Sequence, residues 1–199
     1  MELMPGKPLG SMALHALIDS PLEKIAVVVH PDDPLHWLIA DEGSGGDALA
    51  SKPLVQIVLC LNAGQGISQS IRSGMRSLMA DQAEPEAIII VLADQPLITK
   101  AMVAELIRYW REHPQLDFVA TAAQDESRTA NVLMPPALLS RKMFAELLTL
   151  EGDIGARRVL MSPAFHGRGL AAKERTATLD VDTPDDLEQA RKYMLQDDK

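Results

Sequence analysis

The chain has 199 residues, of which 47% are apolar, with a formal net charge of −9 and a mean hydropathy of 0.00. This length suits one well-buried domain spanning residues 1–199, in a soluble globular protein. The acidic charge and few aromatic residues exclude a nucleic-acid surface, which needs a basic footprint and often stacking platforms. No apolar run reaches membrane length and no signal peptide is present, so we expect a cytoplasmic protein without a membrane partner.

The first 40 residues predict a loop, a helix, a strand and a short helical piece. Residues 1–11 carry two prolines and two glycines, which is typical of a loop. Ser11 is a candidate N-cap for a short helix that Pro21 ends. The apolar run at 24–30 predicts a buried strand, and residues 35–40 predict the short helical piece.

A second apolar run, at 55–61, predicts another buried strand and contains Cys60, the only cysteine. We expect a buried, unreactive thiol and no disulfide within the chain. The loop at 62–70 then places two glycines and two serines at the strand end, which allows close backbone approach to a ligand. Taken alone, the same loop fits an ordinary glycine turn with a serine cap before the next helix.

The chain is organised around the run at 87–93, whose isoleucines and valines predict a strand buried on both faces. Pro96 forbids continued pairing, so Asp94 should lie at the carboxyl end of this strand, where open α/β sheets bind ligands. Thr99 should cap the helix that follows. Asp94 is then either a metal ligand or a turn former that bonds its own backbone, and alone it favours the turn former.

Further on, residues 117–123 predict a fourth strand, and Pro135-Pro136 predicts the start of a helix. Asp153 can cap another short helix, and residues 162–175 are typical of a loop.

Near the C-terminus, residues 178–182 alternate in polarity, so a strand there puts Asp180 and Asp182 on one face. Paired acids on such a strand cost free energy unless a cation satisfies them. Thr183 and Pro184 then begin a final helix. The alternation of strands with helices along the whole chain indicates an α/β three-layer sandwich with a mostly parallel sheet.

Four segments in this order, taken together, resemble the MobA-like nucleotidyltransferases, most closely the molybdenum cofactor cytidylyltransferase branch. They read NAGQGISQSIRSGM, VLADQPLI, LLTLEGDIGARRVL and LDVDTPDDL. The resemblance covers roughly residues 7–195 and implies a Rossmann-like, glycosyltransferase-A type fold. It also implies Mg²⁺-dependent transfer of CMP or GMP, from CTP or GTP, to a phosphorylated molybdopterin-type cofactor with release of pyrophosphate. A second copy of the chain or a molybdoenzyme are the protein partners to expect.

The resemblance assigns roles to individual residues. Asp94 matches the catalytic and metal-holding aspartate of the family, and either Asp180 or Asp182 matches the second acidic ligand. Lys7 is a match for the lysine that ends the family's phosphate loop. The remaining matches line the substrate pocket or the acceptor site: Asn62, Gly66, Ser68, Ser70, Gln95, Asp153 and Arg157.

The chain also departs from the family pattern. Members begin with a strand and a glycine-rich loop that holds the nucleotide phosphates, and this chain starts after them, so we expect an N-terminally truncated domain whose first strand is missing. Lys7 equally matches a segment just downstream of that loop. The segment before the acceptor helix, residues 125–131, is altered as well, which bears on the acceptor.

Three readings follow: an enzyme, a non-catalytic relative that binds a cofactor or a partner, and a degraded paralogue that keeps only the fold. In the family, the missing strand lies between the strands that match 24–30 and 87–93. We therefore predict that these two strands pair directly or that another segment or chain fills the gap, because buried unpaired backbone groups are costly. Either outcome predicts weak binding of Mg-nucleotide, which an upstream extension should restore.

Overall fold

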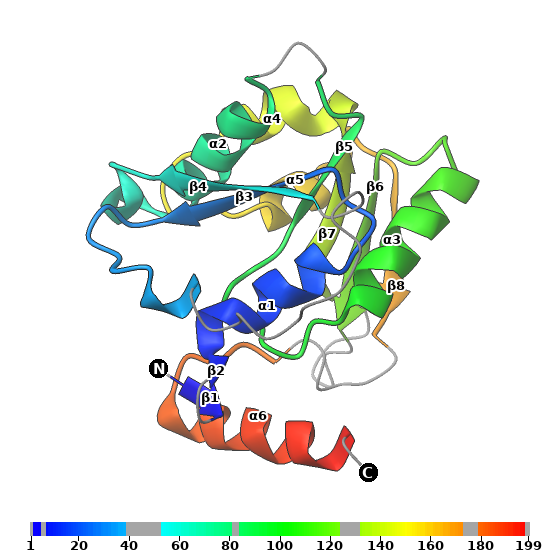
Figure 1. Ribbon diagram of the computed structural model, residues 1–199. Coiled ribbons are helices and arrows are strands. Elements are labelled where there is room, and N and C mark those ends of the chain that lie inside the picture. Colours follow the sequence, from blue (N-terminus) through cyan, green and yellow to red (C-terminus); the bar gives the residue numbers. More distant parts are fainter. Residues whose placement is uncertain are drawn as a thin grey trace.

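The computed structural model describes residues 2–4, 7–38, 53–80, 84–123, 132–172 and 179–197. Within them, helices cover both sides of the strands, so the chain is layered (Figure 1). The larger sheet has four strands, in the spatial order β5 (Ala87–Ile90), β7 (Val132–Ser140), β6 (Phe118–Ala123) and β8 (Gly167–Ala171). A separate parallel pair joins β3 (Lys24–Val29) to β4 (Leu54–Leu59). The predicted α/β class is confirmed, with β7 antiparallel to both of its neighbours.

Two groups of helices sandwich the larger sheet. One face packs against α1 (Leu9–Ile18) and α3 (Lys100–Glu112). Thr99 caps α3 as predicted, because its hydroxyl accepts a hydrogen bond from the Met102 amide. The other face packs against α2 (Ile67–Leu78), α4 (Phe144–Leu148) and α5 (Arg157–Leu160). None of the helices in the described part of the chain is long and apolar enough to cross a membrane.

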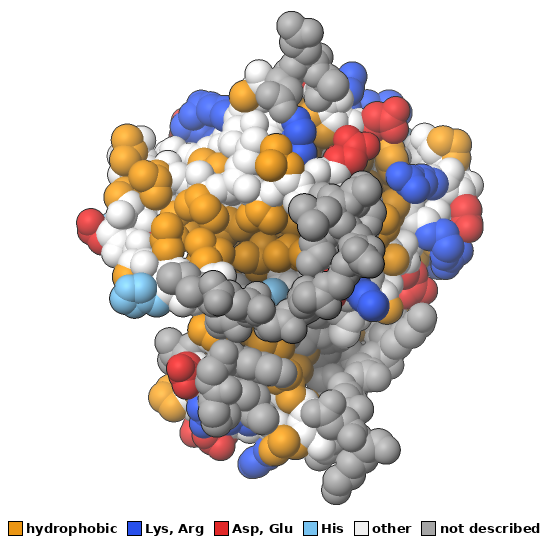
Figure 2. All heavy atoms as spheres, in the orientation of Figure 1, with side chains coloured by type: hydrophobic (Ala, Val, Ile, Leu, Met, Phe, Trp, Pro, Cys, Tyr) orange, Lys and Arg blue, Asp and Glu red, His pale blue; other side chains and the backbone are white. Residues whose placement is uncertain are grey.

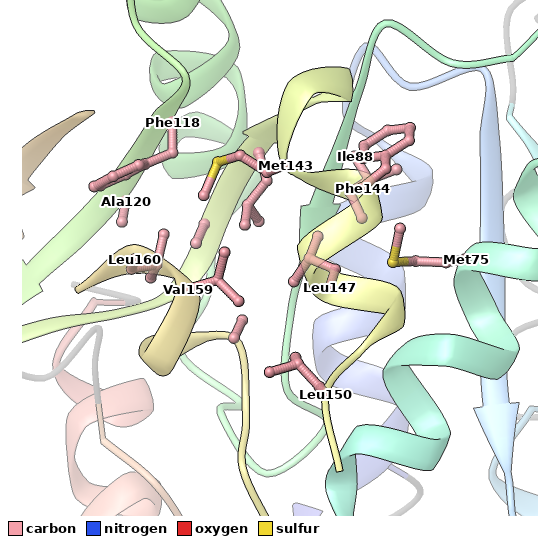
Figure 3. Packing of buried hydrophobic residues seen from close by; sticks show 13 residues of the cluster. Met75, Ile88, Phe118, Ala120, Met143, Phe144, Leu147, Leu150, Val159 and Leu160 are labelled. Carbon is pink, nitrogen blue, oxygen red and sulfur yellow. The ribbon is translucent and has the colours of Figure 1, made fainter. Parts of the chain in front are cut away.

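The core on the second face joins elements that are far apart in the sequence. Figure 3 shows Met75 of α2 and Leu147 of α4 pointing toward each other, with Ile88 of β5 close by. Leu150 and Val159 complete this side of the cluster, and both are almost fully buried. The loop between α4 and α5 is therefore held against α2 by apolar packing.

The N-terminus and the last helix form a small unit at one end of the molecule (Figure 1). It consists of β1 (Glu2–Met4), β2 (Lys7–Pro8) and α6 (Pro184–Asp197). Leu3 is fully buried in an apolar cluster with Val181 and Leu187. Arg191 ties the pieces together, because its Nε donates to the carbonyl of Leu3 over 2.7 Å. The predicted start of α6 is confirmed by the reciprocal hydrogen bonds of Thr183 with Asp186.

Short 3₁₀ turns occupy three of the connections: η1 (His36–Leu38), η2 (Ala63–Gln65) and η3 (Arg141–Met143). The first lies in the predicted short helical piece at 35–40, of which residues 39–40 fall outside the described part. The altered segment at 125–131 also falls outside the described residues.

The prediction that residues 1–11 form only a loop is wrong. Residues 2–4 and 7–8 pair as a short antiparallel hairpin, and α1 begins at Leu9. Ser11 is therefore inside the helix rather than at its cap, and its buried hydroxyl donates to the carbonyl of Pro8 over 2.8 Å.

The prediction of a helix from Pro135-Pro136 is also wrong, because both prolines lie inside β7. Ala120 of β6 pairs with Ala137, whereas the next residue, Thr121, pairs with Met134, so the prolines form a bulge in β7. A bulge residue leaves the ladder and needs no backbone N–H, which is the group that proline lacks.

The predicted loop at 162–175 contains a strand, β8. Gly167 and Gly169 lie inside this strand, although glycine is rare in strand interiors. Here a Cβ on Gly167 would come within 2.3 Å of the Phe118 ring, so close packing of two strands requires a residue without a side chain. Conversely, residues 179–182 were predicted as part of a strand and form none.

Strand β4 is only half covered, although it was predicted to be buried. Its alternate residues Val55, Ile57 and Leu59 are exposed, whereas Gln56 and Cys60 face α2 through hydrogen bonds to Ser77 and Ser73. Cys60 itself is buried, as expected. An apolar run in the sequence does not reveal that a layer covers only one face.

Strands β3 and β5 do not pair with each other. A cleft of about 900 Å³ lies between them instead, lined by residues of both strands. Of the two predicted outcomes, direct pairing is therefore excluded, and no strand of the described residues fills the gap. Filling by a segment outside the described residues or by another chain stays a prediction.

Candidate functional site

Two carboxylates meet where β5 leads into α3. Asp94 lies four residues beyond the end of β5, in a tight turn, and its backbone carbonyl accepts a hydrogen bond from the Val181 amide over 2.9 Å. This bond places Asp180 and Asp182, on either side of Val181, beside the turn. The segment is supported from behind, because Val181 is buried against Leu3 of the N-terminal hairpin.

Gln95 joins the two halves of this site. Its side chain is fully buried, and its amide Nε2 donates to Oδ1 of Asp180 over 2.7 Å. The other amide atom, Oε1, is buried and has no hydrogen-bond partner among the described residues. Burying a polar atom in this way costs free energy unless something else satisfies it.

The electrostatics of Asp94 favour a cation. Burial, followed by the negative charge of Asp180, raises the pKa of the Asp94 carboxyl above its ordinary value of 3.8, and Asp182 adds a smaller effect in the same direction. Its Oδ1 is buried without a hydrogen-bond partner among the described residues. A positive charge between Asp94 and Asp180 would remove this repulsion.

The donor set suits a cation that binds phosphate, rather than a metal enclosed by protein ligands. No group of three or more His, Cys, Asp or Glu side chains within the described residues is arranged to hold a metal ion. Mg²⁺ and similar ions are commonly bound by one or two carboxylates, with phosphate oxygens and water completing the shell. Asp94 with Asp180 supplies such a pair, whereas Asp182 is exposed and raises the pKa of Asp94 less than Asp180 does.

A second group of predicted residues gathers where the loop before α2 meets the loop before α5. Gly66 has a φ of 107°, and a Cβ there would lie 2.3 Å from the carbonyl carbon of Gly152. The amide of Ser68 donates to the carbonyl of Gly152 over 3.2 Å. Two of the four resembling segments, far apart in the sequence, are therefore in direct backbone contact.

Buried donors line this second group. The Ser68 side chain is fully buried, and its Oγ has no hydrogen-bond partner within the described residues. Arg72, one helical turn further along α2, donates from Nη1 to the carbonyl of Leu150 over 3.2 Å, and its Nε is buried without a described partner. The sequence reasoning missed Arg72, although it lies on the same helix face as Ser68 in the resembling segment.

The other predicted site residues are more open. Asn62, Asp153 and Arg157 are exposed, and Ser70 is half-buried at the edge of the cleft between β3 and β5. Asp153 does not cap α5, which begins at Arg157 without a side-chain cap. The side chain of Lys7 lies outside the described part of the chain. Among described residues, no hydrogen bond joins the Asp94 group to the Ser68 group.

The unsatisfied atoms single out these two groups. Five buried side-chain atoms within the described residues lack a hydrogen-bond partner, and four of them belong to Ser68, Arg72, Asp94 and Gln95. Native structures satisfy nearly all buried polar atoms with protein groups, ordered water or ligands, so these four atoms make the two groups the candidate site.

Comparisons with known proteins identify the family of the chain. The family described as MobA-like NTP transferase domain matches residues 1–168. Purine catabolism protein PucB of Bacillus subtilis (strain 168) is 28% identical over 193 residues, which cover 96% of this chain and 86% of PucB.

Solved structures share the fold. A homologue of Mycobacterium tuberculosis Rv0371c from Mycobacterium sp. strain JC1 has a TM-score of 0.69 at 23% identity, covering 96% of this chain and 84% of that one. Rv0371c of M. tuberculosis H37Rv, in complex with manganese, has a TM-score of 0.65 at 20% identity, covering 93% and 86%. The family match extends over most of the sequence and includes three of the four resembling segments. The chain belongs to the MobA-like NTP transferase family.

Proposed function

We propose that this chain binds a nucleoside triphosphate with a divalent cation and transfers its nucleotidyl group to a phosphorylated acceptor of the molybdopterin type. The observation that carries the proposal is the buried, unpartnered Oδ1 of Asp94 beside Asp180, at the end of a strand in an α/β fold. The family match supports the reaction class, and the manganese complex of Rv0371c supports a divalent cation.

Each residue has a distinct task in this proposal. Asp94 and Asp180 hold the cation, and Gln95 fixes the orientation of Asp180. The cation, Mg²⁺ being our choice, supplies charge neutralisation at the phosphates. Ser68 and Arg72 offer buried donors to the ligand where the loops before α2 and α5 touch.

The chemistry needs no nucleophile from the protein. A phosphate oxygen of the acceptor attacks the α-phosphorus, the bond from that phosphorus to the α,β-bridging oxygen breaks, and pyrophosphate leaves with the electron pair. The residues act by positioning the reactants and by offering fixed donors to the developing charge. CTP is the donor that we favour over GTP, because the resembling segments are closest to the cytidylyltransferase branch.

A second candidate is a binding protein that holds the nucleotide or the cofactor without transfer. The open cleft between β3 and β5, next to Asp94, favours this candidate. Transfer requires the phosphates of the nucleotide to be held in a precise position, and an open cleft holds them less firmly. In both candidates the ligands are a nucleotide and a molybdopterin-type cofactor, delivered to a second protein such as a molybdoenzyme.

Two measurements test the proposal. Calorimetry with CTP and with GTP, each with and without Mg²⁺ or Mn²⁺, should show nucleotide binding that requires the cation. Release of pyrophosphate from CTP with molybdopterin as acceptor separates the two candidates, because only the enzyme releases it. Cation-independent binding that Asp94→Asn leaves unchanged contradicts both candidates.

A further inference from the structure

Strand β4 has an outer edge on the side away from β3. Within the described residues β4 pairs only with β3, in parallel and without a register shift. The amides of Leu54 and Cys60, at its two ends, donate to carbonyls at the two ends of β3. Backbone groups alternate in direction along a strand, so the N–H and C=O groups of Val55, Ile57 and Leu59 point to the outer edge.

Exposed apolar side chains follow this edge. Val55, Ile57 and Leu59 are between 37% and 56% exposed, and Leu61, just beyond the strand, is 80% exposed. Figure 2 shows apolar side chains gathered on the face of the molecule where β3 and β4 lie in Figure 1. Exposed apolar surface beside unpaired backbone groups is typical of a surface that binds another polypeptide.

The edge of β4 has none of the usual features that prevent pairing. Proteins commonly protect an edge strand with a charge, a proline or a bulge. No residue from 53 to 71 is charged, and neither a proline nor a bulge interrupts β4. The larger sheet ends in β8, which carries an exposed charge at Arg168. Of these two edges, β8 is therefore protected against pairing and β4 is not.

The edge of β4 fits the same edge of a second copy of this chain. A two-fold axis perpendicular to the strands makes the two β4 strands antiparallel and keeps equivalent faces on the same side. The exposed apolar row of one copy then continues into the row of the other, which stabilises paired strands. The chain has a net charge of −9, and a contact without charged residues creates no like-charge pair between two such copies.

The backbone directions select one register. With Ile57 opposite Ile57 of the second copy, Val55 lies opposite Leu59, and all the outward-pointing residues of β4 pair with one another. Each such pair exchanges two hydrogen bonds, which gives about six. A shift by two residues one way puts Leu59 opposite Pro53, which has no N–H. The other shift puts Val55 opposite Leu61, which lies beyond the strand.

The size of the contact predicts a weak dimer. Six residues of extended chain measure about 20 Å, and the strand with the helix layer against it is about 20 Å thick. The contact therefore covers roughly 400 Å² on each copy, or half of the ~800 Å² per partner in a standard stable interface. Such a contact forms at high protein concentration and dissociates on dilution.

We propose that β4 is the contact between two copies of this chain, which pair edge to edge, antiparallel, about a two-fold axis at Ile57. The β3-β4 pairs of the two copies then form one four-stranded sheet. The contact lies on the side of β3 away from the cleft and from Asp94, so the candidate site stays open in both copies. This inference stands independently of the proposed nucleotide reaction.

Sedimentation velocity tests the association. The full chain, measured at concentrations from about 1 to about 200 μM, should change from monomer to dimer. Hydrogen exchange at the upper concentration should be slower at the amides of Val55, Ile57 and Leu59, which point to the second copy. A chain that stays monomeric over the whole range overturns the proposal, and the edge would then serve a different protein.

A charge at the two-fold axis tests the location of the contact. Ile57→Lys puts two like charges opposite each other, so the dissociation constant of the dimer should rise by about tenfold or more. The matched control is Leu195→Lys, because Leu195 is an equally apolar side chain, 56% exposed, on α6. This variant should dimerise within about twofold of the unaltered protein. Circular dichroism establishes that both variants fold, and equal dimerisation of the two overturns the proposal.

A cross-link tests the pairing and its register, and it decides the question if Ile57→Lys does not fold. In the proposed dimer the Cα atoms of Ile57 and its copy lie about 5.5 Å apart, within the range of a disulfide. Ile57→Cys should therefore form a covalent dimer under mild oxidation, seen on a non-reducing gel. The native Cys60 is only 1% exposed, so the unaltered protein should form none.

Leu59→Cys is the matched control on the same edge. In the proposed register Leu59 lies opposite Val55, four residues from Leu59 of the second copy, or roughly 13 Å away. It should form no disulfide with its own copy. A dimer in solution that does not cross-link through Ile57→Cys, or that cross-links as fast through Leu59→Cys, has a different contact and overturns the proposed pairing.

Discussion

The side-chain amide of Gln95 donates to Oδ1 of Asp180 over 2.7 Å, across 85 positions of sequence. Asp180 therefore has a defined position relative to Asp94, although the segment around it forms no strand. The backbone bond from Val181 to the carbonyl of Asp94 fixes the same junction a second time. These two hydrogen bonds together hold the segment around Asp180 beside Asp94.

This relationship predicts the effect of Gln95→Met, which keeps an unbranched side chain of similar length and removes the donor. Asp180 then loses its orientation, and the affinity for Mg-nucleotide should fall by about 10- to 100-fold, as for other groups that orient metal ligands. Calorimetry measures the affinity. Thermal unfolding should change little, because the substitution also removes the unsatisfied Oε1. Unchanged affinity would mean that Asp180 needs no support from Gln95.

Asp94→Asn tests the cation site itself. The affinity for Mg-CTP should fall by more than about tenfold, equivalent to about 1.4 kcal/mol, because one of two carboxylate ligands is lost. The free energy of unfolding should be unchanged or higher, since the substitution relieves repulsion by Asp180. Asp185→Asn is the matched control, because Asp185 is an exposed acid in the first turn of α6. A large loss of stability with unchanged nucleotide affinity would make Asp94 a structural residue.

The pH dependence of stability should depend in part on Asp117. Its carboxylate accepts a hydrogen bond from the backbone amide of His166 and another from Lys142, and these lower the pKa of Asp117 below 3.8. A lowered pKa means that the folded state binds a proton less readily than the unfolded state. The stabilisation is therefore complete above the ordinary pKa and is lost as the pH falls through the folded value.

Asp117→Asn removes this titration. The variant should be less stable than the unaltered protein at neutral pH, and the difference should shrink as the pH falls below about 4. Urea unfolding at a series of pH values measures both curves. A difference that stays constant over that range would show that the charge of Asp117 contributes nothing.

The sequence predicts elements well where local chemistry decides the structure. Thr99 and Thr183 cap helices as predicted, because caps act within a few residues. The strand predicted over 87–93 ends at Ile90, so Asp94 lies four residues beyond it rather than directly at its end. The predictions failed where a partner from elsewhere decides. The prolines of β7 are tolerated only because the register of β6 shifts opposite them, and no local pattern reveals that shift.

In the candidate site, too, the sequence shows local motifs but not the contacts between distant segments. The resemblance made Asp94 and Ser68 candidates and left Asp180 and Asp182 open, and these assignments stay predictions. Only the fold shows that Gln95 contacts Asp180, which favours Asp180 as the partner of Asp94. Arg72 was missed because its partner, the carbonyl of Leu150, lies 78 positions away. Backbone carbonyls carry no signal in the sequence, so a donor that reaches one cannot be recognised before the fold is known.

The close backbone contact of Gly66 with Gly152 predicts that a larger residue at position 66 destabilises the protein. Gly66 combines a φ of 107° with a virtual Cβ that lies 2.3 Å from the backbone of Gly152, so Gly66→Ala meets both strain and a clash. We expect a loss of about 1–3 kcal/mol in the free energy of unfolding, measured by urea unfolding. The loop before α2 should also shift away from the loop before α5, which weakens nucleotide binding.

Gly64→Ala, two residues earlier, is the matched control. A Cβ at Gly64 meets nothing within 4 Å, so its stability should stay within about 0.5 kcal/mol of the unaltered protein. If the two substitutions cost the same, the backbone contact with Gly152 does not account for the loss at Gly66, because Gly64 has no such contact. If only Gly66→Ala is costly, and nucleotide binding falls with it, then the backbone contact between the two loops shapes the site, because neither substitution adds or removes a polar side chain.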